Sequence, residues 1–397
     1  MTSSFYPPYH VGGACIHVKL LAEELARRGH EVHVLFSMDA YNMKGKTARA
    51  EAESERIFTH PIKTGLSLSP YAAYVLGSSR PVIRNFRSLM QEVKPQIVHH
   101  HNVSLLGYDI LAKRGNYLNL YTAHDYWLIC PQSTLLRARS KVCETASCTF
   151  CGLPNGRPPQ LWRKLASFAS AVESLDVIIS PSEYARARIA KKFEARSTTI
   201  PNFAPNPPHS IPPSGMSDFF LFVGRLEHYK GILGLIRGYG QIEKQLASKL
   251  VIVGQGPLAE PMHDSIRKYD TRHRIVYLEG IDRSVLYGLL RDARALIVPS
   301  IWPENCPLVA LEALSVGTPV LGTNLGGLPE IIMKIDKQLV FGSLTELEDI
   351  LLQFDAIRYT RRDLRGIYEK YYAPAVYMQE YEKLVSSATS GSSQRMT

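Results

Sequence analysis

The stretch that decides the fold is ALIVPSIWPENCPLVALEALSVGTPVLG, residues 295–322. It opens with four apolar residues and continues through a proline-rich loop. After Pro307 the apolar residues recur at helical spacing, and a second β-rich segment begins at Val320. Pro307 suits the first turn of this helix, where no amide hydrogen bond is lost. A strand, a helix and a second strand in this order predict a βαβ unit with parallel strands.

The same alternation runs along most of the chain. In the second half we predict strands at residues 219–223, 250–253, 275–278, 295–298 and 320–322. In the first half we predict strands at residues 31–36, 96–101, 118–122, 177–180 and 197–200, and helices at 14–28, 104–114 and 182–193, the last with Ser182 as N-cap. This pattern is typical of parallel sheets covered by helices, and it predicts an α/β fold with two doubly wound domains.

Residues 201–217, PNFAPNPPHSIPPSGMS, have no helical or strand period and are predicted to link the two domains. We therefore assign residues 1–205 to an N-terminal domain and 206–365 to a C-terminal domain. A closing helix is expected within residues 366–386, and residues 387–397 are expected to be a disordered tail.

The beginning of the chain departs from this plan. Only MTSSFYPPY stands ahead of the turn at Gly12 and Gly13, and no apolar strand fits into it. A doubly wound domain normally opens with a buried strand before its first glycine-rich turn. We therefore expect the first strand to be truncated.

Composition narrows the class of protein. The chain has 397 residues, of which 45% are hydrophobic and 21% charged, which excludes a disordered or collagen-like chain. It contains no apolar run of the roughly 18 to 20 residues that span a bilayer, and no basic, apolar signal at its start. We therefore expect a cytoplasmic protein.

The net charge of +10 lies entirely in the first half: residues 1–205 hold 25 Lys and Arg against 15 Asp and Glu, whereas the remainder holds 21 of each. A basic half suits nucleic acid, an anionic membrane or an acidic substrate, or is simply a solvated surface.

Two glycine-containing turns suit phosphate groups. Gly12 and Gly13 directly precede a long helix, whose free amide groups and dipole favour an anion. The strand at 219–223 is followed by Arg225, and Lys230 stands before the next helix. Two cations at this position can neutralise a diphosphate without a metal. An ordinary turn and ordinary surface cations remain the alternatives.

Two carboxylates bracket the start of the helix in the deciding stretch. Glu304 precedes it and Glu312 lies about one and a half turns inside. Carboxylates accept hydrogen bonds from sugar hydroxyls, and the first amides of the helix can hold phosphate or sugar oxygens. As an alternative, both are plain surface charges. A similar arrangement recurs in TNLGGLPEII, where the turn at Gly326 and Gly327 precedes a helix that carries Glu330.

In this order, the segments GGACIHVKLLAEELARRGHEV, VHHHN, TAHDYWLICP, IPN, FVGRLEHYKG, LVIVGQGPL, PENCPLVALEAL and TNLGGLPEII resemble glycosyltransferase family 4. The resemblance covers about residues 5–340. It implies the GT-B fold, in which two Rossmann-like domains face across a cleft, and a retaining enzyme that uses a nucleotide-sugar donor. The N-terminal domain of such an enzyme binds the acceptor, a glycan or a lipid-linked glycan.

The resemblance also implies roles for individual residues. Gly12 and Gly13 would approach the donor diphosphate or the acceptor, and Arg225 and Lys230 would bind the diphosphate. Glu304 would hold hydroxyls of the donor sugar, and the backbone of Asn305, Cys306, Pro307 and Leu308 would contact that sugar. Glu312 would bind the ribose, and His124 would lie near the reacting carbon. Catalysis would rest on His124, Glu304, Arg225 and Lys230.

The implied reaction is front-face displacement with retention, in which the departing diphosphate takes the acceptor proton and no metal or other cofactor is required. One departure concerns specificity: the family often has Gly-Phe after the first glutamate, where this chain has Asn305 and Cys306. The nucleobase, the sugar and the acceptor are not readable from these segments.

Cysteines and histidines offer two further candidate sites. Cys130, Cys143, Cys148 and Cys151 are enough thiols for a structural metal, although their spacing fits no standard finger and buried free thiols are the favoured interpretation. Cys15 is isolated. The run from His99 to His101 stands at a strand end, where successive side chains alternate faces, which disfavours metal binding.

Three groups of basic residues stand in the first half: Arg80, Arg84 and Arg87; Arg137, Arg139 and Lys141; and Arg186, Arg188, Lys191 and Lys192. A basic face on the acceptor domain suits an anionic membrane carrying a lipid-linked acceptor.

The sequence is also compared with three other classes of protein function. A noncatalytic nucleotide-sugar-binding or scaffold subunit of a glycan assembly complex is the main alternative. Nucleic-acid binding is disfavoured because no recognition motif appears, and a nicotinamide-dependent oxidoreductase because no GxGxxG with a following acidic residue is present.

Overall fold

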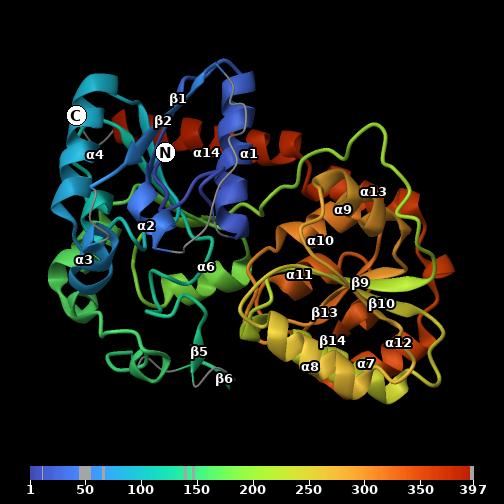
Figure 1. Ribbon diagram of the computed structural model, residues 1–397. Coiled ribbons are helices and arrows are strands. Elements are labelled where there is room, and N and C mark those ends of the chain that lie inside the picture. The colour runs from blue at the N-terminus through green and yellow to red at the C-terminus, as the bar shows by residue number, and fades with distance from the viewer. Residues whose placement is uncertain (11, 44–54, 65–67, 138–140, 145–147, 394–397) are drawn as a thin grey trace. The chain divides into compact units, whose positions relative to one another are not determined.

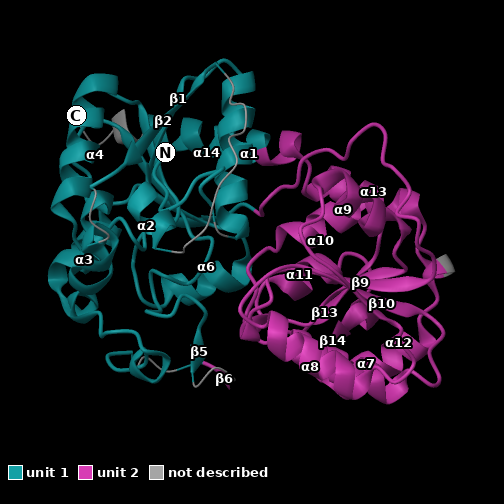
Figure 2. Cartoon of the chain, in the orientation of Figure 1, with its two compact units in different colours: residues 1–138, 143–200, 378–397 teal, residues 139–142, 201–377 magenta. Residues whose placement is uncertain are grey.

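The computed structural model describes residues 1–10, 12–43, 55–64, 68–137, 141–144 and 148–393. The chain divides into two compact units: an N-terminal unit of residues 1–138, 143–200 and 378–397, and a C-terminal unit of residues 139–142 and 201–377 (Figure 2). The main division falls at residue 200, where the proline-rich segment begins.

The C-terminal unit is built on a six-stranded parallel sheet of order β11-β10-β9-β12-β13-β14. Its strands are β9 (Phe219–Val223), β10 (Lys249–Val253), β11 (Ile275–Leu278), β12 (Ala295–Val298), β13 (Val320–Thr323) and β14 (Val340–Phe341). The five predicted strands are confirmed to within one residue at either end, because continuous apolar runs mark strands that are buried on both faces. Only the two-residue β14 was missed.

Helices cover both faces of this sheet (Figure 1). One layer holds α7 (Ile232–Ile242), α8 (Ala259–Tyr269) and α12 (Leu344–Gln353); the other holds α9 (Arg283–Asp292), α10 (Leu308–Ser315) and α13 (Arg361–Tyr371), and the short α11 (Leu328–Ile332) follows β13. The core between the layers is apolar and centres on the β9 side chains, which are almost fully buried.

The N-terminal unit contains the parallel pair β1 (Val32–Ser37) and β2 (Ile57–Ile62) and the parallel strands β3 (Ile97–His100), β4 (Leu118–Thr122), β7 (Val177–Ser180) and β8 (Ser197–Thr199) in that order. Its helices are α1 (Gly13–Arg27), α2 (Met38–Asn42), α3 (Leu68–Leu76), α4 (Arg80–Val93), α5 (Ala166–Glu173) and α6 (Glu183–Ala190). Between these elements the sequence also forms the short strands β5 (Leu136–Arg137) and β6 (Lys141–Val142) and the 3-10 segments η1 (Tyr108–Leu111) and η3 (Leu161–Lys164). The predicted N-cap is confirmed, since Ser182 accepts a hydrogen bond from the amide of Ala185.

The position between β1 and β3, for which the sequence offered no apolar strand, is occupied by the first residues of the chain. Thr2 bridges Leu35 on one side and His100 on the other, both in parallel. The amide of Thr2 donates to the His99 carbonyl, and the amide of Ser3 donates to the Leu35 carbonyl, both at 3.0 Å. No apolar strand forms at this position, as expected, but isolated bridges do, because backbone pairing needs no apolar side chain; Thr2, Ser3 and Ser4 are almost fully buried.

A helix predicted over residues 104–114 is also wrong. Only the 3-10 turn η1 forms, because Gly107 has a φ of 103° and a Cβ there would lie 2.8 Å from the Gly77 carbonyl oxygen. This left-handed backbone conformation cannot continue an α-helix. β2 was missed because its sequence, IFTHPI, contains a proline.

The closing helix is longer than predicted. Residue 366 lies inside α13, and α14 (Pro374–Ser393) runs through most of the segment expected to be disordered. Its buried side chains Tyr377, Tyr381, Leu384 and Ala388 recur at helical spacing, so packing extends the helix beyond the polar sequence signal. Neither this helix nor any other in the described ranges is long and apolar enough to cross a membrane.

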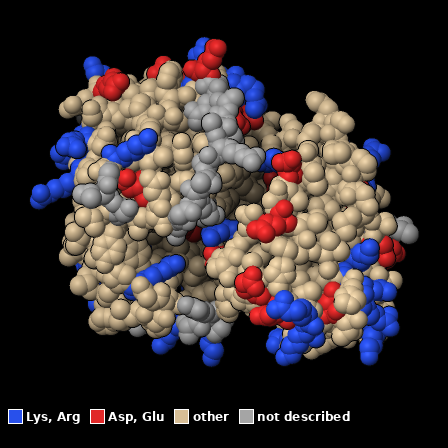
Figure 3. Space-filling view, in the orientation of Figure 1, with Lys and Arg blue, Asp and Glu red and all other residues tan. Residues whose placement is uncertain are grey.

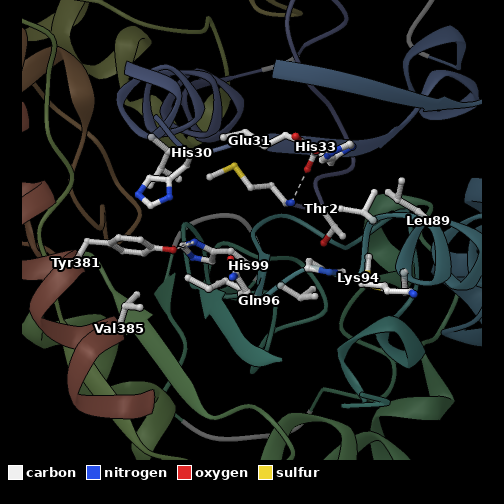
Figure 4. A pocket seen from close by; sticks show the side chains of 18 of the residues that line it. Thr2, His30, Glu31, His33, Leu89, Lys94, Gln96, His99, Tyr381 and Val385 are labelled. Atoms are coloured by element: carbon white, nitrogen blue, oxygen red, sulfur yellow. Dashed lines mark hydrogen bonds and ion pairs between the residues drawn. The ribbon is translucent and has the colours of Figure 1, made fainter. Parts of the chain in front are cut away.

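A cavity of about 520 Å³ lies at the amino-terminal edge of the N-terminal sheet, lined among others by Thr2, His33, His99 and Tyr381 (Figure 4). Ligands of doubly wound sheets bind at the opposite, carboxyl edge. The carboxyl edge of each unit is therefore where a ligand site is expected.

Candidate active site

The C-terminal sheet reverses its strand order between β9 and β12. From β9 the chain adds β10 and β11 on one side and then returns to place β12 on the other side. The loops that follow β9 and β12 therefore leave the carboxyl edge in opposite directions, which is where sheets of this class bind ligands. The first loop carries Arg225 and Lys230, and the second carries Glu304. The sheet thus gathers the predicted residues at its switch point.

Lys230 and Glu304 form an ion pair at this point. Lys230 Nζ lies 2.7 Å from Glu304 Oε1, and Ser300 Oγ donates to the same oxygen at 2.6 Å. The Glu304 side chain is almost fully buried, and Lys230 lies 5.5 Å from the ring centre of Trp302. Hydrogen bonds and the aromatic ring offset the cost of taking both charges out of water. The pair was not predicted, because it joins residues 74 positions apart in the sequence.

The two loops are held together by close backbone approaches. The amide of Ile301 donates to the Tyr229 carbonyl at 2.9 Å, and a Cβ on Gly231 would lie 1.9 Å from the Pro299 carbonyl oxygen. Gly231 has a φ of 74°, so glycine is required there both for space and for backbone conformation. This contact fixes Lys230 beside the loop that carries Glu304.

A second glycine turn supports Glu304 from the other side. The backbone of Glu304 forms a parallel bridge with Gly326, and the amide of Gly327 donates to the Glu304 carbonyl at 2.6 Å. A Cβ on Gly326 would lie 2.2 Å from that carbonyl oxygen. The glycine pair ahead of α11, predicted as a second ligand-binding turn, therefore positions Glu304.

Glu312 is held by a residue that sequence reasoning missed. Arg283, at the start of α9, donates to Glu312 Oε1 at 2.7 Å. Burial raises the pKa of Glu312, and the Arg283 guanidinium acts against that shift. The only sequence signal for Arg283 is its place shortly after β11, at the same carboxyl edge.

Arg225 adopts a different environment from Lys230. It donates to Glu227 at 2.7 Å, and its side chain is 39% exposed. This local partner holds the guanidinium at the carboxyl end of β9, where it stays accessible to an anion.

The start of α10 is fixed by the loop that precedes it. The helix begins at Leu308, so Pro307 is its N-cap residue and lies just outside the first turn, in which the sequence had placed it. The Cys306 carbonyl accepts from Asn202 Nδ2 at 2.9 Å, which ties the loop down. Burial raises the pKa of Cys306 to about 12, so this thiol stays neutral. The first amides of the helix have no intrahelical acceptor, as at any helix start.

In the N-terminal unit, β4 leads into His124, and the helix that begins at Gly13 brings His17 against it, with ring centres 5.0 Å apart. Gly12 has a φ of 86° and forms the N-cap of this helix. Burial lowers the pKa of His124 to about 3. The imidazole of His124 is therefore neutral at physiological pH.

The cysteines form no disulfide with one another. All six are free thiols, and burial raises the pKa of Cys130, Cys148 and Cys151. Within the described ranges no group of three or more His, Cys, Asp or Glu side chains is arranged to hold a metal ion.

The comparisons with known proteins agree with this geometry. The family model described as Glycosyltransferase Family 4 matches residues 11–205, and that described as Glycosyl transferases group 1 matches residues 208–352. An uncharacterised glycosyltransferase of Methanocaldococcus jannaschii is 28% identical over 341 residues, which cover 82% of this chain and 80% of that protein.

Two solved structures share the fold. Sucrose-phosphate synthase from Thermosynechococcus elongatus has a TM-score of 0.72 at 18% identity, with 98% of this chain and 100% of that chain covered. HepE from Anabaena, in complex with UDP, has a TM-score of 0.65 at 15% identity, with 97% and 99% covered.

Two Rossmann-like units of this kind define a GT-B protein. The chain belongs to glycosyltransferase family 4, as its sequence motifs predicted, and is a glycosyltransferase.

The close approach at Gly231 predicts a specific cost in stability. Gly231→Ala should lower the free energy of unfolding by about 1 to 3 kcal/mol, because alanine is strained at this φ and its Cβ meets the Pro299 carbonyl. Denaturant unfolding followed by circular dichroism measures it. Gly366→Ala is the matched control: it lies in α13 with open space around its Cβ, and should gain about 0.5 to 1 kcal/mol. Equal stability of the two variants would contradict this account of the loop contact.

Proposed function

We propose that this glycosyltransferase retains anomeric configuration and moves a sugar from a nucleotide-diphosphate sugar to a glycan or lipid-linked glycan acceptor. The observation that carries the proposal is the Lys230–Glu304 pair at the switch point of the C-terminal sheet. It combines a cation for the diphosphate and a carboxylate for sugar hydroxyls, both already desolvated and hydrogen-bonded. HepE, solved with UDP, is consistent with a nucleoside diphosphate at such a sheet.

The proposed chemistry is front-face displacement. The bond from the reacting carbon to the diphosphate breaks, the acceptor oxygen attacks from the same face, and the departing phosphate oxygen takes the acceptor proton. Lys230 and Arg225 stabilise the charge that develops on the diphosphate, while Glu304 and the amides of Asn305 to Leu308 hold the sugar. Gly12 and Gly13 leave room at the start of α1 for the diphosphate or the acceptor, and Glu312 accepts from ribose hydroxyls. Preorganised groups of this kind act without reorganisation at the moment of reaction.

A cytoplasmic location, at the inner face of a membrane, is part of the proposal. The α4 helix buries Val82, Phe86 and Leu89 and exposes Arg80, Arg84 and Arg87. These arginines and Arg114 line an open pocket of about 520 Å³, and Figure 3 shows basic side chains along the α4 edge of the molecule.

The other basic groups have different surroundings. Arg186 pairs with Glu183, and Arg188 donates to the Cys143 carbonyl. Arg139 lies outside the described residues. In the same unit, Leu76 on α3, Leu161 on η3 and Leu165 just after η3 are more than half exposed. A basic pocket and exposed leucines in one unit suit the headgroups and acyl boundary of an anionic bilayer.

A noncatalytic nucleotide-sugar-binding subunit remains the alternative. It requires the same diphosphate contacts but no stabilisation of a reacting centre. Turnover and binding measured in the same variants separate the two functions.

Lys230→Ala and Glu304→Ala should each lower kcat by about 100- to 1,000-fold, because each removes one preorganised group aimed at the transition state. A coupled assay for released nucleoside diphosphate measures the rate, and thermal unfolding checks that the variants fold. Arg267→Ala, which removes an exposed cation on α8, is the control and should keep the wild-type rate. Near-normal turnover in either site variant would remove that residue from the mechanism.

Calorimetry of UDP, GDP and ADP, without added metal, should find one diphosphate that binds selectively. Its affinity should fall in Lys230→Ala and not in Arg267→Ala. Selective binding without turnover on any acceptor would favour the noncatalytic subunit, and no binding of any of the three would count against both functions.

Sedimentation with vesicles tests the membrane surface. The protein should bind vesicles rich in phosphatidylserine and not neutral ones, and the triple change of Arg80, Arg84 and Arg87 to Ala should abolish most of that binding, at roughly 1 kcal/mol for each arginine. Changing Arg267, Arg362 and Arg365 to Ala removes the same charge from the C-terminal unit and should have little effect. Equal binding to neutral and anionic vesicles would contradict the surface.

A further inference from the structure

Glu312 is a nearly buried carboxylate with one cationic partner. It lies on α10 with 11% of its side chain exposed, and Arg283, at the start of α9, donates to its Oε1 at 2.7 Å. Among the described residues, none donates a hydrogen bond to the other oxygen, Oε2. The carboxylate is therefore fixed at one oxygen, while the other remains for a ligand.

The surroundings of Glu312 supply one cation. α10 contacts β12, β13, α9 and α13, and neither strand carries a charged residue. Arg283 and Tyr287 face the carboxylate from α9, whereas Arg361 and Arg365 of α13 lie at the carboxyl end of α10. Burial raises the pKa of Glu312, and the Arg283 guanidinium opposes that shift. Burial and the nearby carboxylate both raise the pKa of Tyr287, so its hydroxyl stays neutral.

The position of Arg283 follows from the fold of the C-terminal unit. It is the first residue of α9, which a short loop joins to the carboxyl end of β11. Its guanidinium carbon lies 5.8 Å from the centre of the Tyr287 ring, one turn further along the same helix. A planar guanidinium packs on an aromatic ring and donates through a rigid fork. The helix and the ring therefore hold the donor in place beside Glu312.

We propose that Arg283 is a positioning residue for nucleotide binding, which holds Glu312 as a carboxylate in one orientation so that Oε2 accepts hydrogen bonds from the ribose. The proposal rests on the function proposed above, in which Glu312 contacts the ribose. An ionised carboxylate only accepts hydrogen bonds, and those bonds are roughly twice as strong as neutral ones. Protonation of Glu312 would weaken the contact, and Arg283 opposes that protonation.

Loss of Arg283 should make nucleotide binding depend on pH. Burial already raises the pKa of Glu312, and removal of the guanidinium leaves that effect unopposed. A carboxyl group with a higher pKa becomes protonated at a higher pH. A variant without Arg283 should therefore lose affinity as the pH falls, over a range in which the wild-type protein still keeps its carboxylate.

The ionisation of Glu312 can be measured in the free protein. In protein labelled with ¹³C at the glutamate carboxyl groups, the Glu312 signal is assigned from its loss in Glu312→Gln. This signal should titrate at a higher pH in Arg283→Met than in the wild type, whereas Arg283→Lys keeps a positive charge and should stay close to the wild type. An equal midpoint in Arg283→Met and the wild type would overturn the proposal. The titration needs no nucleotide, so its result is independent of the proposed transferase function.

Calorimetry of the selected nucleoside diphosphate tests the consequence for binding. Arg283→Met should bind it about 10- to 100-fold more weakly than the wild type at pH 6, and the deficit should shrink at pH 8.5. The ratio of the two Kd values at each pH cancels the titration of the ligand itself. Arg267→Met removes an exposed cation on α8 and should match the wild type at every pH.

Two outcomes would count against this account of Arg283. A Kd ratio that does not change with pH would show that Arg283 does not act through the ionisation of Glu312. In a Glu312→Gln background, Arg283→Met should change the affinity little, and a full loss there would assign Arg283 a contact of its own. Absence of nucleotide binding in the wild type would overturn the proposed function and the ribose contact, while the carboxyl titration would still show whether Arg283 holds the carboxylate.

Discussion

Parallel pairing of the strands is the constraint on which the site depends. All six strands of the C-terminal sheet run the same way, so the loop after each strand opens at one edge. Since β9 lies at the centre and the order reverses beside it, the loops after β9 and β12 begin next to each other and then diverge. Lys230 and Glu304 meet because of this order, and the backbone contacts at Gly231 and Gly326 fix how closely the loops approach.

The two units treat charge differently at their carboxyl edges. In the C-terminal unit the two buried glutamates at this edge each pair with a cation: Glu304 with Lys230 and Glu312 with Arg283. A paired and hydrogen-bonded charge tolerates burial, whereas a lone one does not. In the N-terminal unit burial lowers the pKa of the clustered histidines, which therefore stay neutral. One edge thus holds paired charges, and the other holds neutral imidazole rings.

The elements that the sequence predicted well are those with a strong local signal. Continuous apolar runs marked β9, β11 and β12 to the residue, because such strands are buried whatever surrounds them. The misses have tertiary causes. The helix expected around Gly107 is interrupted by a close approach to Gly77, and α14 extends as far as it does because its apolar side chains are buried. Residues 1–4 join the N-terminal sheet through backbone bridges and hydrogen bonds that no apolar side chain signals.

By itself, the sequence determined the class of fold, the family and the types of residue at the site, since periodicity, glycine turns and charged residues at strand ends are local properties. Only the tertiary structure decided the partners. That Lys230 pairs with Glu304, that Arg283 holds Glu312 and that His101 bonds His124 depends on which strands lie side by side. Strand order is set by packing between residues far apart in the chain, and no short segment encodes it.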